Sequence, residues 1–498
     1  MTTVPLGARA GGLTALAGAL LAGSLSPGPA APPGGASPAP PGVRAEASAL
    51  PGLDPDAPKA DPAAVAARLL GPLSDPVLGG PATLVVDALT GQVLLANRPT
   101  EPTAPASTVK IATATAALTT LDPDARLRTR AVYLPPASAP PAATAGSPAA
   151  TTGSAAVPGR APLAPGGTLW LVGAGDPTLT AATGAAGYPP AARLSDLAEQ
   201  VRKAGITAVG AVVGDGTAYE GPGMAPGWRD GYVTDGNVTP VSALSVDAGR
   251  ATPGAAGPRS LTPDAAAAAA FRTALTAAGV SVGSVSTGRA DAAAREVGSV
   301  QSPPIPVLVE RMLTDSDNDL AESLGRQVAI ARGLPASFDG ATRGVLGALR
   351  DAGIPTDGAS LRDTSGLSID NRIAPVTLVA ALRTAALPGH PALRTVLSGL
   401  PVAGFTGTLG DRYGPGDTSP GAGVVRAKTG SLRIVTSLAG MVTDSDGRLL
   451  LFGLFAPVEE QGLTKMALDR VAAALASCGC PPAGAGLPSA GPPAPPGG

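Results

Sequence analysis

The sequence predicts an α/β (α+β) protein in which helices flank an antiparallel sheet and a large, mostly β insertion interrupts the domain. Three observations predict this fold class. Two apolar strands joined by a tight turn, within 83–96, lead directly into a helix at 105–118. Two more strands within 434–456 precede a helix at 461–477. The long interval 125–300 has a different sequence pattern, in which short candidate strands alternate with polar or Gly-rich turns.

Length and composition narrow the class of protein. A chain of 498 residues has room for two or three domains. Its net charge of -2 gives no reason to expect nucleic acid or an acidic membrane surface as a partner. An aromatic content of 2% argues against surfaces that stack bases or sugars. Lysine is rare, and because Lys can lose its proton whereas Arg cannot, each Lys is a candidate for chemistry.

Both ends of the chain differ from the folded part. Arg9 precedes a short apolar run, which predicts that residues 1–31 are a secretory signal peptide or a retained membrane anchor. Residues 32–60 form a Pro/Ala-rich linker and 481–498 a Pro/Gly-rich tail. We therefore expect an exported protein, in the cell envelope on its periplasmic or extracellular side.

The remaining residues divide into two parts. The catalytic domain is expected at 61–125 and 301–480, and the insertion at 126–300 with a disordered loop at 135–167. In the insertion, Asp264 is expected to cap the helix 265–278. The other elements expected there are strands at 130–134, 168–172, 206–213 and 280–285 and a helix at 194–205.

The second half of the catalytic domain is expected to be mainly helical before its last strands. Asn318 or Asp319 is predicted to cap a helix that runs through 325–331. A strand at 421–427 is expected to end at Lys428. The other elements expected are helices at 306–313, 340–352, 376–386 and 461–477 and strands at 434–443 and 449–456.

The first chemical motif is Ser107-x-x-Lys110 at the start of the apolar helix 105–118. Residues three apart lie on one helix face, so the hydroxyl and the amine can meet. A Ser hydroxyl becomes a nucleophile when a neighbour takes its proton, and a desolvated Lys with a lowered pKa can do so. Alone, this pattern equally describes an ordinary helix start.

Two further motifs follow in the same order along the chain. Ser316 and Asn318, two apart in a turn, point to one side, where the hydroxyl can relay a proton and the amide can hold substrate. Lys428 and Thr429 at a strand end bring a positive charge and a hydroxyl toward a substrate carboxylate, and Gly430 lets a substrate backbone approach. The three motifs together are typical of penicillin-binding proteins and class A β-lactamases.

From about Pro81 to Cys480 the chain resembles the class C low-molecular-mass penicillin-binding proteins, the D-alanyl-D-alanine carboxypeptidase/endopeptidase family. That family has a transpeptidase/β-lactamase-like α/β domain with large insertions between its first two motifs, and here about 200 residues separate them. The stretches that carry the resemblance are 105–110, Gly175–Thr178, Ala225–Trp228, Ser316–Asn318, Asp363–Ser368, Leu400–Gly404 and Ala427–Ser431.

The resemblance implies a role for each motif residue. Ser107 attacks the penultimate D-Ala carbonyl of a peptidoglycan stem peptide, Lys110 is the general base, and Ser316 shuttles the proton. The substrate is bound by Asn318, Lys428, Thr429 and Gly430, and the backbone N–H groups of Ser107 and Ser431 form the oxyanion hole. β-Lactam antibiotics would acylate Ser107. We expect no cofactor and no metal ion, and endopeptidase activity beside carboxypeptidase activity stays open.

Two positions depart from the family pattern. Members often carry an Arg directly after the Ser-Gly-Leu-Ser stretch, whereas this chain has Ile369 there and Arg372 three residues later. An acidic residue that contacts the amine of the substrate side chain is expected shortly after Trp228, and Asp230 is the candidate. The specificity for the stem-peptide side chain is therefore open.

The sequence also bears on three other functions. A Ser-His-Asp hydrolase is disfavoured because the single His, His390, lies in a Pro/Gly-rich loop. A class A β-lactamase needs a deacylating Glu four residues before an Asn, and no Asn here has one. The alternative from another class is a catalytically silent penicillin-fold protein that binds wall fragments or scaffolds partners. Acylation at Ser107 separates it from the enzyme.

The cysteines, Cys478 and Cys480, are too few for a zinc site. They are either surface thiols or a local disulfide, and export favours the disulfide.

Overall fold

The computed structural model describes residues 50, 53–136, 166–184, 190–254, 256–458 and 460–480. The predicted signal peptide or anchor, most of the linker, the loop expected at 135–167 except its ends, and the C-terminal tail lie outside these residues. None of the helices described is long and apolar enough to cross a membrane.

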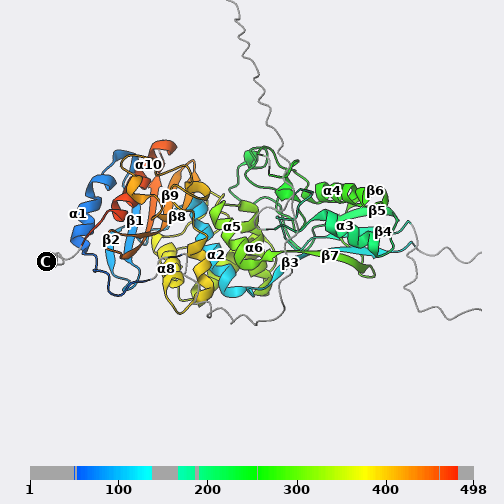
Figure 1. The fold of residues 1–498 in the computed structure, drawn as a ribbon, viewed down its shortest axis with the longest axis horizontal. Helices are drawn as coiled ribbons and strands as arrows, with labels where there is room; N and C mark the ends of the chain where they lie inside the picture. Colours follow the sequence, from blue (N-terminus) through cyan, green and yellow to red (C-terminus); the bar gives the residue numbers. More distant parts are fainter. Residues whose placement is uncertain are drawn as a thin grey trace, which may run out of the picture. The chain divides into compact units, whose positions relative to one another are not determined.

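The first sheet has five strands in the order β2-β1-β10-β9-β8, and every neighbouring pair is antiparallel (Figure 1). The predicted N-terminal hairpin and the predicted pair of C-terminal strands are confirmed, and they meet through β1 and β10. The strands are β1 (Ala82–Asp87), β2 (Val93–Asn97), β8 (Arg426–Leu432), β9 (Val435–Thr443) and β10 (Leu449–Pro457).

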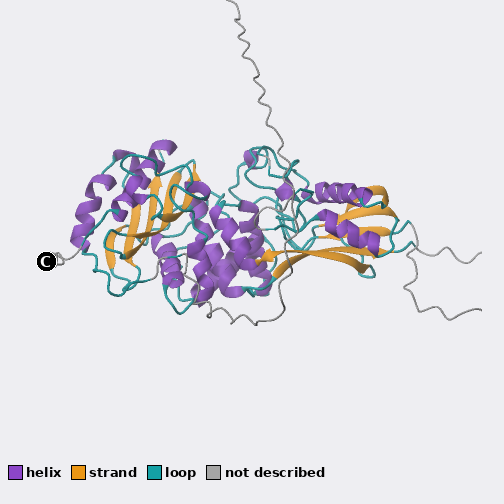
Figure 2. Cartoon of the chain, in the orientation of Figure 1, coloured by secondary structure: helices purple, strands orange, loops and turns teal. Residues whose placement is uncertain are grey.

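Both faces of this sheet are covered, because alternate residues of a strand point to opposite sides and here both sets are apolar. Leu84 and Val86 of β1 face a cluster formed with the central helices, whereas Val85 faces a cluster formed with α1 (Pro62–Leu73) and α10 (Gln461–Ala476). The sheet is therefore the middle layer between two groups of helices (Figure 2). β8 forms one edge of it.

The helices on the first face surround α2 (Lys110–Thr120), in which every residue from Lys110 to Leu118 is buried. This confirms the prediction of a buried helix after Ser107. The helices that pack around it are α5 (Ile305–Thr314), α6 (Asn318–Ala331), α7 (Phe338–Asp351), α8 (Pro375–Ala386) and α9 (Arg394–Ser398).

The insertion contains the second sheet, ordered β6-β5-β4-β3-β7. β4, β5 and β6 run parallel, and helices connect them, as parallel neighbours require. The elements are β3 (Arg126–Leu134), β4 (Thr168–Val172), α3 (Leu194–Lys203), β5 (Ala208–Asp215), α4 (Pro263–Ala277), β6 (Ser281–Thr287) and β7 (Arg295–Pro304). An apolar cluster of its own packs between the sheet and the two helices.

Two predicted helix caps were wrong. Thr262 precedes α4, and Pro263 is its first residue, so the Asp264 carboxylate lies inside the first turn and accepts a hydrogen bond from Ser242 instead. Asp317, not Asn318 or Asp319, caps α6, because its backbone is extended and its carboxylate accepts from Leu320 N at 3.0 Å.

The predicted bounds of the strand before the third motif were also wrong. Residues 419–425 form turns, with Ser419–Gly421 in the short 3₁₀ helix η7 and Val425 N donating to Gly421 O. β8 begins at Arg426 and continues past Ser431, so the motif lies inside the edge strand and not at its end.

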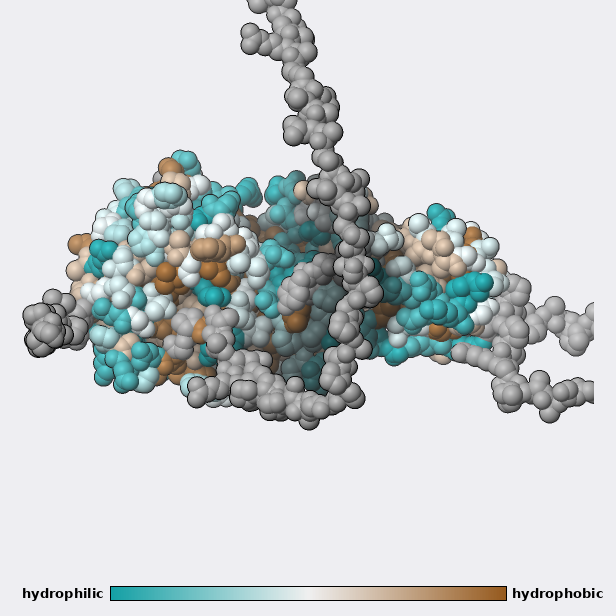
Figure 3. All heavy atoms as spheres, in the orientation of Figure 1, coloured by the Kyte–Doolittle hydropathy of each residue, from teal (hydrophilic) through white to brown (hydrophobic). Residues whose placement is uncertain are grey.

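Two smaller features complete the fold. Cys478 and Cys480 form a disulfide, as predicted, and both are buried beside α10. In the view of Figure 3 the hydrophobic residues of the described surface lie in small groups among hydrophilic ones. Single exposed hydrophobic residues of this kind are ordinary on soluble domains and do not by themselves indicate a partner.

Candidate active site

Ser107 lies on a tight turn directly before α2. The turn is the 3₁₀ helix η2 (Ala106–Val109), and Ala106 has a φ of 48°, a left-handed conformation that is costly for a residue with a side chain. Gly366 presses against it: a Cβ at position 366 would collide with Ala106 O and lie 2.9 Å from Ser107 N. The surrounding chain thus holds the turn that presents the Ser107 hydroxyl.

The Lys110 amine is the centre of the site. Its Nζ lies 3.1 Å from Ser107 Oγ, 2.7 Å from Asn318 Oδ1 and 2.6 Å from Ser365 O. The prediction that residues three apart would bring the hydroxyl and the amine together is confirmed. The side chain is fully buried. With two of its neighbours fixed as acceptors, the amine can point its lone pair at the Ser107 hydroxyl once it is neutral.

Burial also tunes this amine for proton transfer. Loss of hydration lowers the pKa of Lys110 to about 8, and the carboxylates of Asp363 and Glu322 oppose the shift. A base whose pKa lies near the working pH is neutral often enough to accept a proton and still basic enough to hold it.

We expect acylation of Ser107 to speed up with pH until about 8. Below its pKa, the neutral fraction of Lys110 rises about tenfold per pH unit, and above the pKa it levels off. The second-order rate constant for acylation by benzylpenicillin, measured between pH 5.5 and 10, checks this. A profile that is flat from pH 6 to pH 9 would contradict the assignment of Lys110 as the base.

The second motif lies at the start of α6. Ser316 has a φ of 57°, and the turn places both Ser316 and Asn318 at the cavity described below. Asn318 Nδ2 donates to Asn237 O at 2.8 Å while its Oδ1 accepts from Lys110. Asn237 belongs to the insertion, so the insertion takes part in orienting the motif. The sequence patterns did not single out Asn237.

The third motif lies in the edge strand β8, beside the cavity. Lys428 is fully buried and donates from Nζ to Thr429 O at 3.0 Å, while Thr429 and Ser431 line the cavity. Burial, reinforced by the neighbouring Lys110 ammonium, lowers the pKa of Lys428 well below its ordinary value. A substrate carboxylate would supply the opposite charge that Lys428 lacks there.

The direction of the Ser431 N–H follows from strand geometry. Ala427 N donates to Pro401 O, away from the neighbouring strand β9. Successive N–H groups alternate along a strand, so the N–H of Ser431, four residues on, points the same way, out of the free edge. It faces the cavity that Ser107 also lines, as an oxyanion hole requires.

The structure gives a further reason why residue 430 is a glycine. A Cβ there would collide with Ser437 Oγ and lie 2.8 Å from Pro105 O and 3.0 Å from Ala106 Cβ. The missing side chain therefore lets β8 lie against the Ser107 turn and the Ser437 side chain.

We expect Gly430→Ala to push the Ser107 turn away from β8. Acylation should fall roughly 10- to 100-fold, because small displacements of reacting groups are expensive. The unfolding free energy should fall by about 1–3 kcal/mol from overpacking. Gly71→Ala is the matched control, since a Cβ in that helix would meet open space. Unchanged acylation in Gly430→Ala would refute this reason for the glycine.

A cavity of about 650 Å³ joins the motifs. From the predicted set it is lined by Ser107, Ser316, Asn318, Thr429 and Ser431. Lys110, Lys428 and Gly430 do not line it and lie buried behind its wall. The other lining residues are Asn237, Leu367, Thr408, Asp411, Arg412, Gly462, Lys465, Met466 and Asp469.

Some of these lining residues could have been identified from the sequence, and others could not. Thr408 Oγ1 lies 2.8 Å from Thr429 Oγ1, so two hydroxyls converge on one spot in the wall. No motif pointed to Thr408. Lys465 could have been found from the scarcity of lysine, which made each one a candidate. Arg412 is neutralised within the wall by Asp469, at 2.8 Å and 2.5 Å.

The structure does not bring Asp230 to this cavity. It is exposed, at the start of the 3₁₀ helix η3 (Asp230–Tyr232), and it is not among the lining residues. Ile369 packs with an apolar group beside the Ser107 turn. Arg372 donates to the carbonyls of Ile369 and Asn371 and lines a different pocket, so it does not replace the Arg that the family often has.

The Ala225–Trp228 stretch, by contrast, contacts the site from the insertion. Trp228 Nε1 donates to Asp363 Oδ2 at 2.6 Å, and Asp363 is the carboxylate with the largest influence on Lys110. Within the described part of the chain, no three His, Cys, Asp or Glu side chains come together as metal ligands.

Comparison with known proteins places this arrangement in context. The model of the D-Ala-D-Ala carboxypeptidase 3 (S13) family matches residues 65–135, 160–260 and 250–475. A carboxypeptidase of Mycobacterium tuberculosis is 41% identical over 421 residues, which cover 84% of this chain and 85% of that protein. Carboxypeptidase DacB of Mycolicibacterium smegmatis is 39% identical over 450 residues, covering 89% and 90%.

A solved structure shares the fold. Penicillin binding protein 4 of Haemophilus influenzae superposes with a TM-score of 0.64 at 22% identity, over 82% of this chain and 97% of that one. At this identity the likeness concerns the fold, including a sheet that belongs to an inserted domain.

Proposed function

Since the chain belongs to the D-Ala-D-Ala carboxypeptidase 3 (S13) family, we propose that its serine-type carboxypeptidase reaction runs through an acyl-enzyme on Ser107. The single observation that carries this proposal is the buried Lys110 amine, 3.1 Å from Ser107 Oγ and with a pKa lowered to about 8. The residue roles below follow from that contact and from the cavity that the motifs share.

In the acylation step, neutral Lys110 takes the proton from Ser107 while Oγ attacks the carbonyl carbon of the penultimate D-Ala. The N–H groups of Ser107 and Ser431 stabilise the oxyanion that forms. The C–N bond then breaks, and the departing D-Ala amine receives a proton by way of Ser316. Water hydrolyses the ester in the second step and regenerates the Ser107 hydroxyl.

The terminal carboxylate of the substrate binds at the β8 wall. Thr429 and Thr408 offer two hydroxyls there. A bound carboxylate also opposes the lowering of the Lys428 pKa and so favours the ammonium form that compensates its charge. Asn318 contacts the substrate backbone and at the same time holds Lys110. Asp230 has no contact with the substrate in this mechanism, because it does not line the cavity.

The direct test uses two compounds that should both react with Ser107, a stem-peptide analogue and benzylpenicillin. Purified protein should release D-Ala from a stem-peptide analogue that ends in D-Ala-D-Ala. Brief exposure to benzylpenicillin should leave a lasting adduct on the Ser107 peptide, found by mass spectrometry. An adduct that clears within seconds would indicate a β-lactamase, and no adduct on folded protein would favour a silent wall-binding or scaffold role.

Endopeptidase activity is the second candidate, favoured by the volume of the cavity. Besides the motif residues, Lys465 and Asp411 line this cavity of about 650 Å³, which leaves room for a leaving residue that carries further chain. The same assay with a cross-linked peptide in place of the D-Ala-D-Ala peptide decides this. If only the uncrosslinked peptide is cleaved, this candidate is wrong.

The family's activity on the wall peptide implies an envelope location. We propose in addition that the chain is exported and that residues 1–31 act as a cleaved signal or a membrane tether; peptide sequencing of the mature N-terminus decides between them. β-Lactam inhibition is supported by the penicillin binding protein of Haemophilus influenzae, which was solved complexed with a β-lactam.

A further inference from the structure

A stripe of polar residues runs along one face of α6, away from the solvent. Asn318, Glu322 and Arg326 are spaced four apart, so they lie one above another on the helix. Asn318 belongs to the second motif. Glu322 and Arg326 are almost fully buried, with side-chain exposures of 0% and 1%, and the reaction scheme assigns neither of them a role. Buried charged residues are rare and need specific partners.

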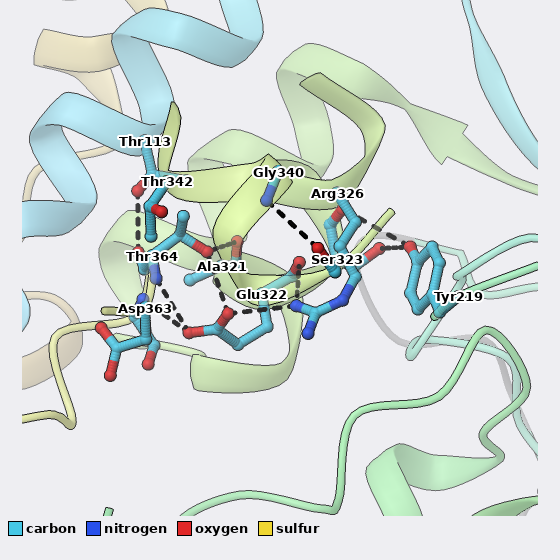
Figure 4. Close-up of polar contacts among 12 residues, drawn as sticks. Thr113, Tyr219, Ala321, Glu322, Ser323, Arg326, Gly340, Thr342, Asp363 and Thr364 are labelled. Carbon is cyan, nitrogen blue, oxygen red and sulfur yellow. Dashed lines mark hydrogen bonds and ion pairs between the residues drawn. The ribbon is translucent and has the colours of Figure 1, made fainter. Parts of the chain in front are cut away.

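The Glu322 carboxylate accepts hydrogen bonds from a loop of the active site. Its Oε1 accepts from Thr364 N at 3.0 Å and Ser365 N at 2.9 Å, and its Oε2 accepts from Thr364 Oγ1 at 3.1 Å. Figure 4 shows the carboxylate between the Thr364 segment and the Arg326 side chain. Two successive backbone N–H groups on one oxygen fix the direction in which this loop runs.

Arg326 holds Glu322 in place and favours its ionised form, against the burial and the Asp363 carboxylate, which raise the pKa of Glu322. Its Nη1 lies 3.2 Å from Glu322 Oε2, and its guanidinium carbon lies 4.2 Å from the centre of the Phe338 ring. The ring packs on the guanidinium plane and excludes water from the pair. The ion pair is thus a rigid brace between α6 and the loop 363–368.

The loop in turn touches the catalytic base. The Ser365 carbonyl accepts from Lys110 Nζ at 2.6 Å, and the other end of the same peptide unit, Gly366 N, donates to Asp363 Oδ1 at 2.8 Å. Glu322 holds the peptide unit before it, and so the orientation of the Ser365 carbonyl depends on that glutamate.

We propose that Glu322 is a positioning residue for the reaction: through the Thr364–Ser365 backbone it aims the Ser365 carbonyl at Lys110, and thereby directs the amine to Ser107. α6 then acts on the base twice, directly through Asn318 and indirectly through Glu322. The inference rests on the proposed role of Lys110 as general base.

A purely structural ion pair would affect stability alone, whereas a positioning residue also changes the chemistry of the base. The charged groups that act on Lys110 are the carboxylates of Glu322, Asp363, Asp317 and Asp319, and Lys428 is a neighbouring amine. Of these carboxylates, Glu322 can be neutralised without altering a motif residue or the helix cap.

The experiment compares Glu322→Gln, Glu322→Asp and wild type in pre-steady-state acylation by a chromogenic β-lactam between pH 5.5 and 10. The burst amplitude counts folded sites, so the rate constant per site is independent of partial unfolding. Asp87→Asn is the matched control, because Asp87 and Arg448 form an equally buried ion pair elsewhere in the domain, with exposures of 2% each.

We expect Glu322→Gln to lower the plateau rate constant roughly 10- to 100-fold and to move the acid limb of the profile to lower pH, since a charge that favours the ammonium is lost. Glu322→Asp keeps the charge but cannot reach both N–H groups, so its plateau should fall while its limb stays near that of wild type. Asp87→Asn should change neither.

Two results would overturn the inference. One is a wild-type rate constant and acid limb in both Glu322 variants, and the other is an equal change in Asp87→Asn. If Glu322→Gln yields no folded protein, Glu322→Asp decides by its plateau. Absence of any Ser107 adduct in the wild type would instead refute the proposed function, so the two failures are distinguishable.

Discussion

Replacing Ser107 by alanine should abolish acylation by benzylpenicillin and lower D-Ala release at least about 10⁴-fold. The hydroxyl is the atom that forms the covalent bond, and the rest of the cavity can only bind the substrate. Folding should be preserved, because Ser107 is only half-buried and Lys110 keeps its acceptors Asn318 and Ser365. Mass spectrometry after penicillin exposure, together with a thermal melt, measures both parts of the expectation.

The control for this variant is Ser195→Ala, in the first turn of α3 in the insertion, where Ser195 is half-buried like Ser107. It removes a hydroxyl of the same kind away from the motifs, and acylation should be unchanged. Normal turnover in Ser107→Ala would show that another nucleophile performs the reaction.

The second large effect is expected at Lys110. Both Lys110→Arg and Lys110→Met should slow acylation about 10²- to 10⁴-fold, which is the range that a general base contributes. Arginine keeps the positive charge beside Asp363 and Glu322 but cannot give up a proton, whereas methionine keeps the length without the amine. A similar loss in both variants therefore identifies proton transfer, and not charge, as the function of the lysine.

The pH dependence of the acylation rate gives a second test of the Lys110 variants. The rise of the acylation rate up to about pH 8 should disappear when the titrating amine is removed. Lys203→Met is the control, because Lys203 is exposed on α3, where it pairs with Glu199. Retention of the wild-type profile in Lys110→Arg would contradict the assignment of Lys110 as the base.

These expectations concern residues that the sequence alone could identify. Ser107 and Lys110 are three apart on a turn entering a helix, and Ser316 and Asn318 are two apart in a turn, so their mutual geometry is local. The strands and the buried helix around them were likewise predictable, because apolar periodicity reports which face of an element is covered. The features that could be predicted were those that depend on residues close together in the sequence.

The ends of elements were less predictable, since several residues there compete for one cap. Three acidic or amide side chains stand in a row at 317–319, and each could cap α6 by composition. Asp317 takes the cap because Asn318 is drawn to Lys110 and Asp319 receives Thr239 N and pairs with Arg259 of the insertion. Those competing partners are visible only in the folded chain.

The folded structure also explains why particular residue types occur at certain positions. Gly430 is small because the Ser107 turn lies against β8, and Glu322 is charged because two backbone N–H groups of a distant loop need an acceptor. Lys110 and Asn318 touch across 208 positions of sequence. The sequence by itself determined the chemistry available and its local spacing. Only packing decided which distant groups share a desolvated space, and it is desolvation that turns an ordinary lysine into a base.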